Sequence, residues 1–548
     1  MSLTSNVISK RGADALVETF KLAGVKTIFT LSGNHIMPIF DALIDSGIRL
    51  IHTRHEAAAV HMADAYARLT GEVGIALVTG GPGHANAISA LYTAKMAESP
   101  VILISGHAPL SQLGKGAFQE MEQAELAKPI AKASWLSNSI DSLPFDFAKA
   151  VSIAKSGRPG VVHLSIPIDL LEAQYPPTFK LPSEKDFLSA KEALPKDIIQ
   201  NILQVLTSAK KPLILTGPQM QSKSGQLQLT HLEKVLGIPV IGMESPRGIL
   251  DPSLGSFAQV LAQSDCVLFL GKKIDFTVKF GQSPAFLKTC QFLQIDPDPK
   301  EIKKAKVMLD QKLALSCQAE VMPVIEALIE MGKTNHAHED WYAIVHKAIE
   351  YRPESWLTAS ASEGFVHPAK AFAKIQSILD SHPDSVLICD GGEIGQWAQA
   401  CLHAPHRIIN GVAGAIGAGI PFAAAASLVK DGAPIVAVMG DGSFGFHCAE
   451  IDTAVRYDLP YLLIIGNDAC WNAEHQIQLR EYGKDRATGC DLLPTRYDEV
   501  ARGFGGHGES VNDLADLLPA CQRALDSQLP ACINMMIPSL AAPNLNPY

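Results

Sequence analysis

Short apolar runs alternate with amphipathic stretches along most of the 548-residue chain. In the first part, four runs that end in Gly, Pro or Ser turns flank stretches of helical periodicity, and they read VKTIFTL, VGIALVTGG, SPVILISG and GVVHLSIP. The alternation returns with KKPLILTGP, GIPVIGM, DCVLFLGKK and CQFLQIDPDP, and again with SVLICDGGE, APIVAVMGDGS, LPYLLIIGND and ACINMMIP. Buried strands that alternate with helices are typical of an α/β protein with doubly wound parallel sheets.

Two polar stretches divide the chain into three α/β segments of similar size. The first stretch, at residues 175–196, contains PPTFKLPSEKD, and the second, at residues 333–367, contains NHAHEDW and YRPESW. At about 150 residues per domain, the length also favours several domains over one. The pattern therefore predicts three consecutive domains, at residues 1–180, 190–335 and 360–548.

Composition and charge exclude several classes of protein. Hydrophobic residues make up 47% of the chain and charged residues 19%, so the chain can bury large cores and is not expected to be disordered. The net charge of −10, without a basic block, argues against nucleic acid as a partner. The sequence begins without an apolar signal core, and its ten cysteines form no CxxC pair, so we expect a cytoplasmic protein with reduced thiols.

One uncharged run is long enough to be considered as a membrane span. Residues Gly411–Val429 carry no charge, but they are mainly glycine and alanine and include Pro421. Such a run inserts poorly compared with a leucine-rich one. We therefore expect a tightly packed, buried helix at this place and no association with a membrane.

The strongest chemical signal lies in the third segment, where two predicted strands end in acidic residues. PIVAVMG runs into a GDG motif at residues 440–442, and LPYLLIIG ends at Asn467 and Asp468. Both strand ends are expected at the carboxyl edge of a parallel sheet, where the glycines admit a phosphate and Asp441 and Asp468 offer oxygen ligands to Mg²⁺. A GDG alone could be only a tight turn. Its combination with a second acidic strand end is more specific.

The GDG followed about 26 residues later by Asn-Asp resembles the signature of thiamine diphosphate-dependent enzymes. The resemblance implies thiamine diphosphate and Mg²⁺ as cofactors, with Asp441, Asp468 and the main-chain oxygen of Cys470 as metal ligands. Asp468 departs from the asparagine that is usual in the family. An acid still supplies an oxygen there and adds one negative charge.

A second block of the same resemblance lies in the first segment. RHEAAAVHMADAYARLTG is similar to a family segment whose glutamate corresponds to Glu56. In that role Glu56 would bind the aminopyrimidine ring of the cofactor and take part in proton transfer, whereas without the resemblance it would be an exposed glutamate on a helix surface. Similarity extends over essentially the whole chain and implies the domain order pyrimidine-binding, central Rossmann-like and diphosphate-binding.

The resemblance assigns further contacts to the cofactor. Family members bend the cofactor over a bulky aliphatic side chain, and GVAGAIGAG puts Ile416 at that place, with the carbonyl of Gly414 next to it. Without the resemblance, Ile416 would be an ordinary core residue. CDGGEIGQW puts Glu393 and Ile394 where backbone groups meet the diphosphate. The remaining expected contacts are Gly440, Asp441, Gly442, Ser443, Asp468, Cys470, Trp471, Asn472 and Ala473.

Local patterns narrow the choice within the acetolactate synthase-like superfamily. LSGNHIMPIFDAL and NDACWNAEHQ resemble benzaldehyde lyase, in which the histidine that corresponds to His35 enters the substrate pocket. GAFQE supplies Gln119 as a second pocket residue, and His84 follows GGPG near the expected substrate. A plainer interpretation of His35 is a loop histidine that caps a turn. We expect Glu56, His35, Gln119 and His84 to be the catalytic residues.

The central segment resembles 2-hydroxyacyl-CoA lyases and oxalyl-CoA decarboxylases. SPRGILDPSLG and LGKKIDFTVKFG correspond to blocks that line an ADP pocket for CoA, so Arg247, Lys272 and Lys273 are candidate phosphate contacts. Lysines of this kind are more commonly solvated at the surface. No local block requires FAD, which acetolactate synthases bind, and we do not expect this protein to need it.

These observations favour a lyase or carboligase that makes or breaks a C–C bond beside a carbonyl, acting on 2-hydroxyacyl or 2-oxo substrates. A 2-hydroxyacyl-CoA lyase that acts on a CoA thioester is one form of this prediction. The alternatives are an acetolactate synthase and a 2-oxoacid or oxalyl-CoA-type decarboxylase; a protein of a different class would be an inactive binding or regulatory subunit with the same fold. The resemblance implies a homodimer or homotetramer with active sites between subunits. The donor and acceptor substrates are left open.

Overall fold

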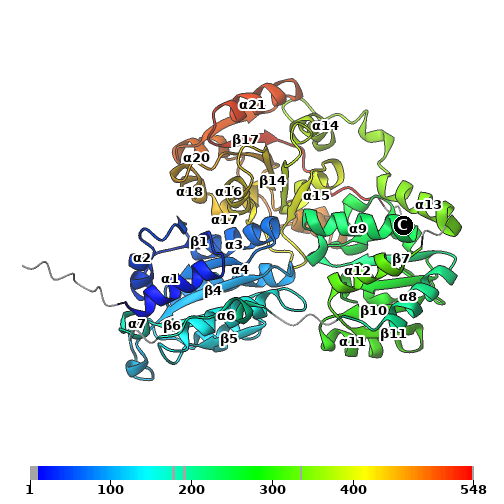
Figure 1. The fold of residues 1–548 in the computed structure, drawn as a ribbon. Helices are drawn as coiled ribbons and strands as arrows, with labels where there is room; N and C mark the ends of the chain where they lie inside the picture. Colours follow the sequence, from blue (N-terminus) through cyan, green and yellow to red (C-terminus); the bar gives the residue numbers. More distant parts are fainter. Residues whose placement is uncertain (1–9, 176–178, 189–192, 334–335, 546–548) are drawn as a thin grey trace, which may run out of the picture. The chain divides into compact units, whose positions relative to one another are not determined.

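The computed structural model describes residues 10–175, 179–188, 193–333 and 336–545. They form three parallel sheets with flanking helices, coloured blue to cyan, green, and yellow to red along the chain (Figure 1). The predicted fold class, α/β with three doubly wound parallel sheets, is confirmed. The chain divides into two compact units, residues 1–67 with 71–190 and residues 68–70 with 191–548, so the second unit holds both the middle and the last sheet.

The first unit contains a six-stranded sheet of order β2-β1-β3-β4-β6-β5. Its strands are β1 Thr27–Thr30, β2 Arg49–His52, β3 Gly74–Val78, β4 Val101–His107, β5 Ala133–Leu136 and β6 Val162–Pro167. Its helices are α1 Gly12–Leu22, α2 Met37–Ala42, α3 Glu56–Thr70, α4 Pro82–Met96, α5 Gln123–Ala127, α6 Leu143–Lys155 and α7 Ile168–Glu172. Every residue of β3, β4 and β6 is buried, which explains why these strands appear in the sequence as continuous apolar runs.

The middle sheet has five strands in the order β11-β10-β9-β7-β8. They are β7 Pro212–Thr216, β8 Val240–Gly242, β9 Cys266–Leu270, β10 Gln291–Asp296 and β11 Leu313–Gln318. Its helices are α8 Lys196–Ser208, α9 Lys223–Leu236, α10 Phe257–Leu261, α11 Pro299–Leu309, α12 Val321–Met331 and α13 Glu339–Glu350.

The last sheet has six strands in the order β13-β12-β14-β15-β17-β16. They are β12 Val386–Asp390, β13 His406–Ile409, β14 Ile435–Gly440, β15 Tyr461–Asn467, β16 His507–Val511 and β17 Pro530–Met536. Its helices are α14 Pro368–Leu379, α15 Gly392–Cys401, α16 Gly419–Val429, α17 Asp441–His447, α18 Glu450–Arg456, α19 Asn472–Glu481, α20 Tyr497–Gly503 and α21 Leu514–Asp526.

A buried ion pair joins the middle and last segments inside the second unit. The Arg407 guanidinium, on β13, donates from Nε to Glu244 Oε1 at 2.9 Å, and the Glu244 side chain is only 6% exposed. Burial raises the pKa of Glu244 against the opposing effect of Arg407. A carboxylate at this depth needs its cation, so the pair ties the segment after β8 to the last sheet.

The uncharged run at residues 411–429 differs in part from the prediction of one buried helix. Only α16 is helical, from Gly419, and most of its residues are buried. Residues 411–418 form a loop because Gly411, Gly414 and Gly417 have φ angles of 71°, 67° and 92°, which glycine adopts without a steric penalty. No helix in the described ranges has the length and apolarity to cross a membrane.

The strand order places two loop pairs where ligands of such sheets bind. In the last sheet the order reverses between β12 and β14, and in the first sheet it reverses between β1 and β3. Loops that leave the carboxyl ends of strands at such a reversal diverge to opposite faces and leave a crevice between them. Both crevices hold residues that the sequence analysis predicted to be functional.

Candidate active site

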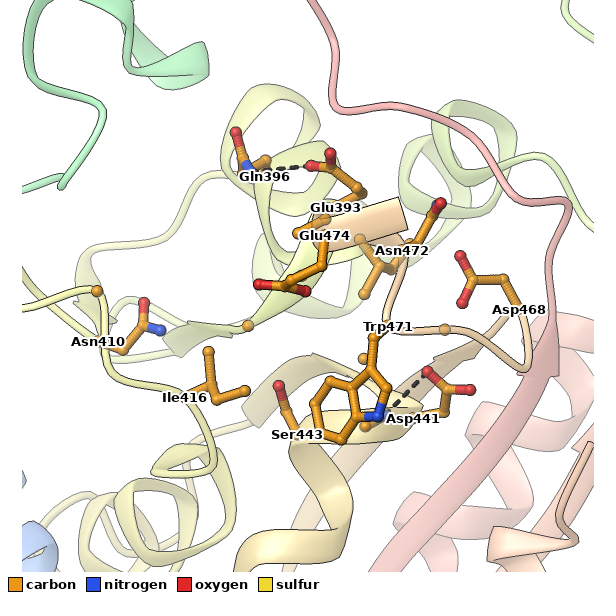
Figure 2. Close-up of a pocket in the computed structure, with 18 of the residues that line it drawn as sticks. Glu393, Gln396, Asn410, Ile416, Asp441, Ser443, Asp468, Trp471, Asn472 and Glu474 are labelled. Carbon is orange, nitrogen blue, oxygen red and sulfur yellow. Dashed lines mark hydrogen bonds between the residues drawn. The ribbon is translucent and has the colours of Figure 1, made fainter. Parts of the chain in front are cut away.

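The second unit contains a cavity of about 380 Å³ at the carboxyl edge of the last sheet. Figure 2 shows the carboxyl groups of Glu393, Asp441, Asp468 and Glu474 around it, with the ring of Trp471. The other lining residues are Ser245, Pro246, Arg247, Gly391, Gly392, Ile394, Gln396, Gln399, Asn410, Gly414, Ile416, Gly440, Gly442, Ser443, Gly466, Cys470, Asn472 and Ala473. Every cofactor contact predicted in the third segment therefore lines one cavity.

Asp441 and Asp468 follow the neighbouring strands β14 and β15. Gly440 and Gly466 pair across these strands, so the two carboxyl groups emerge at one edge of the sheet. Burial raises the pKa of Asp441 to about 6, although the amides of Gly442 and Cys470 oppose the shift. Burial and the charge of Asp441 together raise the pKa of Asp468 to about 7.

Among the described residues, no cationic side chain forms an ion pair with either Asp441 or Asp468. Asp441 Oδ1 accepts the Gly442 N–H at 2.9 Å, but Oδ2 is buried and has no partner in the described residues. A hard divalent cation would satisfy this oxygen and favour both carboxylates. Nowhere in the described ranges do three His, Cys, Asp or Glu side chains form a metal cluster. The main-chain oxygen of Cys470 therefore stays the predicted third ligand, and burial raises the pKa of the Cys470 thiol to about 12.

The turn before α15 is shaped to receive an anion. Gly391 and Gly392 have φ angles of 58° and 59°, and a Cβ on Gly391 would lie 1.8 Å from Ser443 Oγ. Glycine is thus required where the chain passes Ser443. The first residues of the ten-residue helix that follows, Gly392, Glu393 and Ile394, line the cavity, and the free N–H groups of a helix N-terminus bind phosphate in many proteins.

Glu393 lies on the first turn of α15 and is 8% exposed. Its Oε2 accepts a hydrogen bond of 3.0 Å from Gln396 Nε2, drawn as the dashed line beside Gln396 in Figure 2. Burial raises the pKa of Glu393, and Arg247, whose Nη2 lies 4.0 Å from Oε2, opposes the shift. Arg247 thus reaches this cavity from the segment after β8.

A buried aspartate holds the loop that carries Ile416. Asp390, at the end of β12, accepts the N–H groups of Gly417 and Gly419 at 3.1 and 2.7 Å. Burial raises the pKa of Asp390 to about 6, while these two amides oppose the shift. Ile416 is half-buried and lines the cavity, so it is not an ordinary core residue.

Several predicted residues of the first unit follow the carboxyl ends of its strands. Glu56 begins α3 and is 8% exposed, which excludes the exposed helix-surface alternative. Asn86 Nδ2 donates to Glu56 Oε2 at 3.0 Å, and Oε1 lies 3.3 Å from the place of a Cβ on Gly83. The start of α4 therefore supports Glu56 and leaves little space beside it.

His35 and Gln119 lie together at the same sheet edge. His35 is 2% exposed, and its Nδ1 lies 3.4 Å from Thr79 Oγ1. Burial lowers the pKa of His35, while Gln119 and the Phe118 backbone oppose the shift, so the imidazole is neutral near pH 7. Gln119 has a left-handed φ of 57°, and its Oε1 is buried without a partner in the described chain. A strained residue with an unpaired amide oxygen is a frequent feature of binding sites.

His84 is turned toward the interior of the first unit. It is 0% exposed, its Nδ1 lies 2.8 Å from Ser105 Oγ, and its ring is 4.5 Å from that of His163. Burial lowers the pKa of His84 to about 4, so its ring is neutral. These contacts are those of a buried support behind the crevice, and direct action of His84 on a substrate stays a prediction.

Lys272, a candidate phosphate contact, is buried and bonded to other residues of the chain in this structure. Lys272 is 3% exposed, and its Nζ donates to Thr277 Oγ1 at 2.7 Å and to Asp275 Oδ1 at 3.2 Å. The ammonium is therefore used to hold the turn after β9. Lys273 is half-buried.

Three parts of the chain match the three domains of one family. Residues 10–126 match the thiamine pyrophosphate enzyme N-terminal TPP binding domain, residues 199–328 the central domain, and residues 390–535 the C-terminal TPP binding domain. A 2-hydroxyacyl-CoA lyase 2 of Caenorhabditis elegans is 30% identical over 581 residues, which cover 96% of this chain and 88% of the relative. The chain belongs to the thiamine pyrophosphate enzyme family.

Other relatives of this thiamine pyrophosphate enzyme are named either acetolactate synthase or 2-hydroxyacyl-CoA lyase 2. An acetolactate synthase large subunit of Mycobacterium tuberculosis is 29% identical over 545 residues, with 96% of each chain covered. A 2-hydroxyacyl-CoA lyase 2 of Danio rerio is 29% identical over 576 residues, which cover 96% of this chain and 92% of the relative. The predicted superfamily is confirmed, and both names agree with the two functions weighed from the sequence.

Several residues of this thiamine pyrophosphate enzyme were missed in the sequence. Asn86, Asp390 and Gln123 bind other predicted residues or their loops. Asn86 follows Glu56 by 30 positions and could have been proposed only from the TGGPGHANA block. Asp390 precedes the Gly-Gly turn at a strand end, which is a signal that a topological argument could have used.

We expect Gly442→Ala to weaken thiamine pyrophosphate binding about 10- to 100-fold, because overpacking costs about 1–3 kcal/mol. A Cβ on Gly442 would lie 2.5 Å from the Trp471 ring, which lines the cavity. The matched control is Gly445→Ala on the same helix, where an added Cβ meets no atom within 4 Å. Calorimetric titration of each variant measures the affinity, and equal values for the two variants would refute the steric argument.

Proposed function

We propose that this thiamine pyrophosphate enzyme is a Mg²⁺-dependent lyase or carboligase that cleaves or forms a C–C bond in 2-hydroxyacyl or 2-oxo compounds. The 2-hydroxyacyl-CoA lyase activity is the favoured form. The observation that carries the proposal is the pair His35 and Gln119, in which a neutral imidazole lies beside a residue with a left-handed backbone and an amide oxygen that has no partner in the described residues. Such a pair can hydrogen-bond the hydroxyl or carbonyl of a substrate and relay its proton.

The diphosphate end of the cofactor and its metal fit the cavity of the second unit. The N–H groups of Glu393 and Ile394 would bind the diphosphate, and Asp441, Asp468 and the Cys470 carbonyl would hold Mg²⁺. The unpaired Oδ2 of Asp441 and the raised pKa values of both acids support a cation there. Trp471 and Asn472 complete the wall, since Asn472 Nδ2 donates to the Leu540 carbonyl at 2.9 Å and is held in place.

When bound, thiamine diphosphate supplies a carbon nucleophile that adds to a carbonyl and stabilises negative charge at the carbon it has attacked. Glu56 would exchange a proton with the aminopyrimidine ring through Oε1, because Oε2 is engaged by Asn86. Ile416 would pack against the cofactor, and the carbonyl of Gly414 would accept a hydrogen bond from it. His35 Nε2 and the Gln119 amide would orient the substrate oxygen and move its proton as the C–C bond breaks.

The CoA part of the proposal depends on Arg247. Lys272 is committed to the turn after β9, whereas the Arg247 side chain is 49% exposed at the cavity. A guanidinium binds phosphate oxygens through paired N–H groups. Arg247→Ala should therefore affect CoA thioesters more than short substrates. Acetolactate synthesis from pyruvate is the second candidate function, because relatives of that name are about as similar as the lyases.

For the activity itself, we expect aldehyde release from a 2-hydroxyacyl-CoA to exceed acetolactate formation from pyruvate. Purified protein with thiamine diphosphate and Mg²⁺ is assayed on a 2-hydroxyacyl-CoA, on benzoin and on pyruvate. His35→Ala should lower kcat about 100- to 1,000-fold while cofactor affinity changes little, because the imidazole would act on the substrate. The control is His231→Ala, on an exposed position of α9. Efficient acetolactate formation without turnover of any 2-hydroxyacyl substrate would refute the proposal.

Glu56→Gln should keep the fold and most of the cofactor affinity. It should slow proton exchange at the reactive carbon of the cofactor, and turnover, by about two to four orders of magnitude, the span of a well-placed acid–base group. NMR of hydrogen–deuterium exchange on the bound cofactor measures the first effect. Asn86→Ala, which removes the Glu56 partner, should have a smaller effect of the same kind. Exchange at the native rate in Glu56→Gln would exclude the residue from the mechanism.

The metal ligand Asp468 can be tested by two substitutions. Asp468→Asn keeps an oxygen donor, so cofactor affinity and activity should be retained. Asp468→Ala removes the donor and should weaken Mg²⁺-dependent cofactor binding at least about 10-fold. Titration with thiamine diphosphate at several Mg²⁺ concentrations measures both. Cofactor affinity that is unchanged in both variants, or independent of Mg²⁺, would show that the metal site lies elsewhere.

We also propose a cytoplasmic homodimer or homotetramer in which Glu56 of one chain serves the diphosphate site of another. Glu56→Gln and Asp441→Ala chains are each expected to be inactive. When they are mixed and allowed to exchange subunits, hybrid sites with both native groups should restore part of the activity. The mass of the assembly and the exchange are verified by light scattering and by differently tagged chains. Complete exchange without recovered activity would contradict a shared site.

A further inference from the structure

The segment that carries Gln119 is fixed to the first sheet by one buried side chain. Gln123, the first residue of α5, is 1% exposed. Its Oε1 accepts the N–H of Gly81 at 2.7 Å, and its Nε2 donates to the Gly106 carbonyl at 3.1 Å and to Ser165 Oγ at 2.8 Å. A backbone N–H can only donate and a carbonyl can only accept, so these bonds determine the orientation of the amide.

The three partners of Gln123 belong to three different strand ends. Gly81 lies between β3 and α4, Gly106 lies on β4, and Ser165 lies on β6. One side chain thus connects the 116–125 segment to three neighbouring strands of the first sheet. Two further bonds hold the same segment: Ser134 Oγ donates to the Ala124 carbonyl at 2.8 Å, and His107 Nε2 lies 3.0 Å from the Met121 carbonyl.

Gly81 links Gln123 to Gln119, because it is hydrogen-bonded to Gln123 and packed against the backbone of Gln119. Gly81 has a φ of 57°, and a Cβ there would lie 2.9 Å from the Gln119 carbonyl oxygen and 3.2 Å from its Cα. The backbones of Gly81 and Gln119 are therefore packed in direct contact. Since Gln119 is itself left-handed, its conformation persists only while its surroundings hold it.

The same amide also borders the His35 pocket. A Cβ on Gly80 would lie 3.1 Å from Gln123 Oε1 and 3.2 Å from His35 Nδ1, so both atoms surround one glycine. The bond from the Gly81 N–H keeps this oxygen from turning toward His35. The same nitrogen, His35 Nδ1, lies 3.4 Å from Thr79 Oγ1.

We propose that Gln123 is a positioning residue for the reaction, which holds Gln119 and the Gly80–Gly81 turn in the geometry that His35 requires. The proposal rests on the proposed role of Gln119 and His35 in binding the substrate oxygen. Gln123 does not contact the substrate. It acts by keeping a strained residue in place, and its loss should lower kcat/KM without a matching loss of cofactor affinity.

The test uses Gln123→Met, which keeps the length of the side chain and removes its hydrogen bonds. The control is Gln112→Met, an exposed position just before the same segment. Hydrogen–deuterium exchange of the full-length protein is followed in peptides that cover residues 80–91 and 114–122. We expect faster exchange in both peptides for Gln123→Met than for the native protein. For Gln112→Met we expect the native exchange rate in both peptides. Unchanged exchange in Gln123→Met would overturn the proposal.

A double-mutant cycle separates positioning from a general structural role. We expect Gln123→Met and Gln119→Ala each to lower kcat/KM on the 2-hydroxyacyl substrate about 10- to 100-fold, and the double variant to be no worse than Gln119→Ala by more than about 3-fold. Effects that multiply would show that Gln123 acts independently of Gln119 and would overturn the proposal. Cofactor affinity should stay within about 3-fold of the native value in all three variants.

The anchoring role of Gln123 and the substrate role of Gln119 can be refuted separately. If exchange becomes faster in Gln123→Met but Gln119→Ala is fully active, the anchoring by Gln123 is supported and the substrate role of Gln119 in the proposed function is refuted. If Gln123→Met does not fold, Gln123→Glu replaces it, because this variant keeps the acceptor for the Gly81 N–H and loses the donor to Gly106. Exchange at the native rate in residues 114–122 of Gln123→Glu would then overturn the proposal.

Discussion

Parallel strands deliver their carboxyl ends to one edge of a sheet, and the chemistry of this protein depends on that constraint. In the last sheet, β12, β14 and β15 end at Asp390, Gly440 and Asn467, so their loops open into one cavity. In the first sheet, the loops after β1 and β3 bring His35 next to Thr79. Residues far apart in sequence become neighbours because the strand order reverses at both places.

The burial of carboxylate charges is the main electrostatic cost at the cavity of the second unit. Four carboxyl groups line it with a single guanidinium, that of Arg247, among the described lining residues. The raised pKa values of Asp441 and Asp468 express this imbalance, because a carboxylate in a poorly solvated site is unstable without a cation. A divalent ion bound with the diphosphate would reverse it, so metal and cofactor binding are expected to support each other. As a proposed metal ligand, Asp468 would strengthen this coupling by adding a charge where the resemblance gives an asparagine.

In the first unit, a network of hydrogen bonds holds a strained stretch of backbone in place. Gln119 and Gly81 both have positive φ angles, and they lie against each other beside His35. The amide of Gln123 and the serine hydroxyls at the ends of β5 and β6 satisfy the polar groups around them. A polar network that is almost fully bonded keeps the geometry of a site unique, whereas an apolar core of the same volume would leave the backbone free to relax.

The sequence by itself determined the fold class and named most of the residues that line the cavity of the second unit. Apolar runs predict strands, and glycine and acidic residues at their ends lie in the loops whatever the details of packing, so GDG, Asp468 and Glu393 could be named from local pattern and resemblance. Only the tertiary structure decided which partners the long side chains bind. Lys272 could reach solvent or Thr277, and only the packing of the turn after β9 selects the latter. Likewise, Asn86, Gln123 and Asp390 act through hydrogen bonds to partners distant in sequence, and the direction of such bonds follows from the three-dimensional arrangement of strands, which no local pattern encodes.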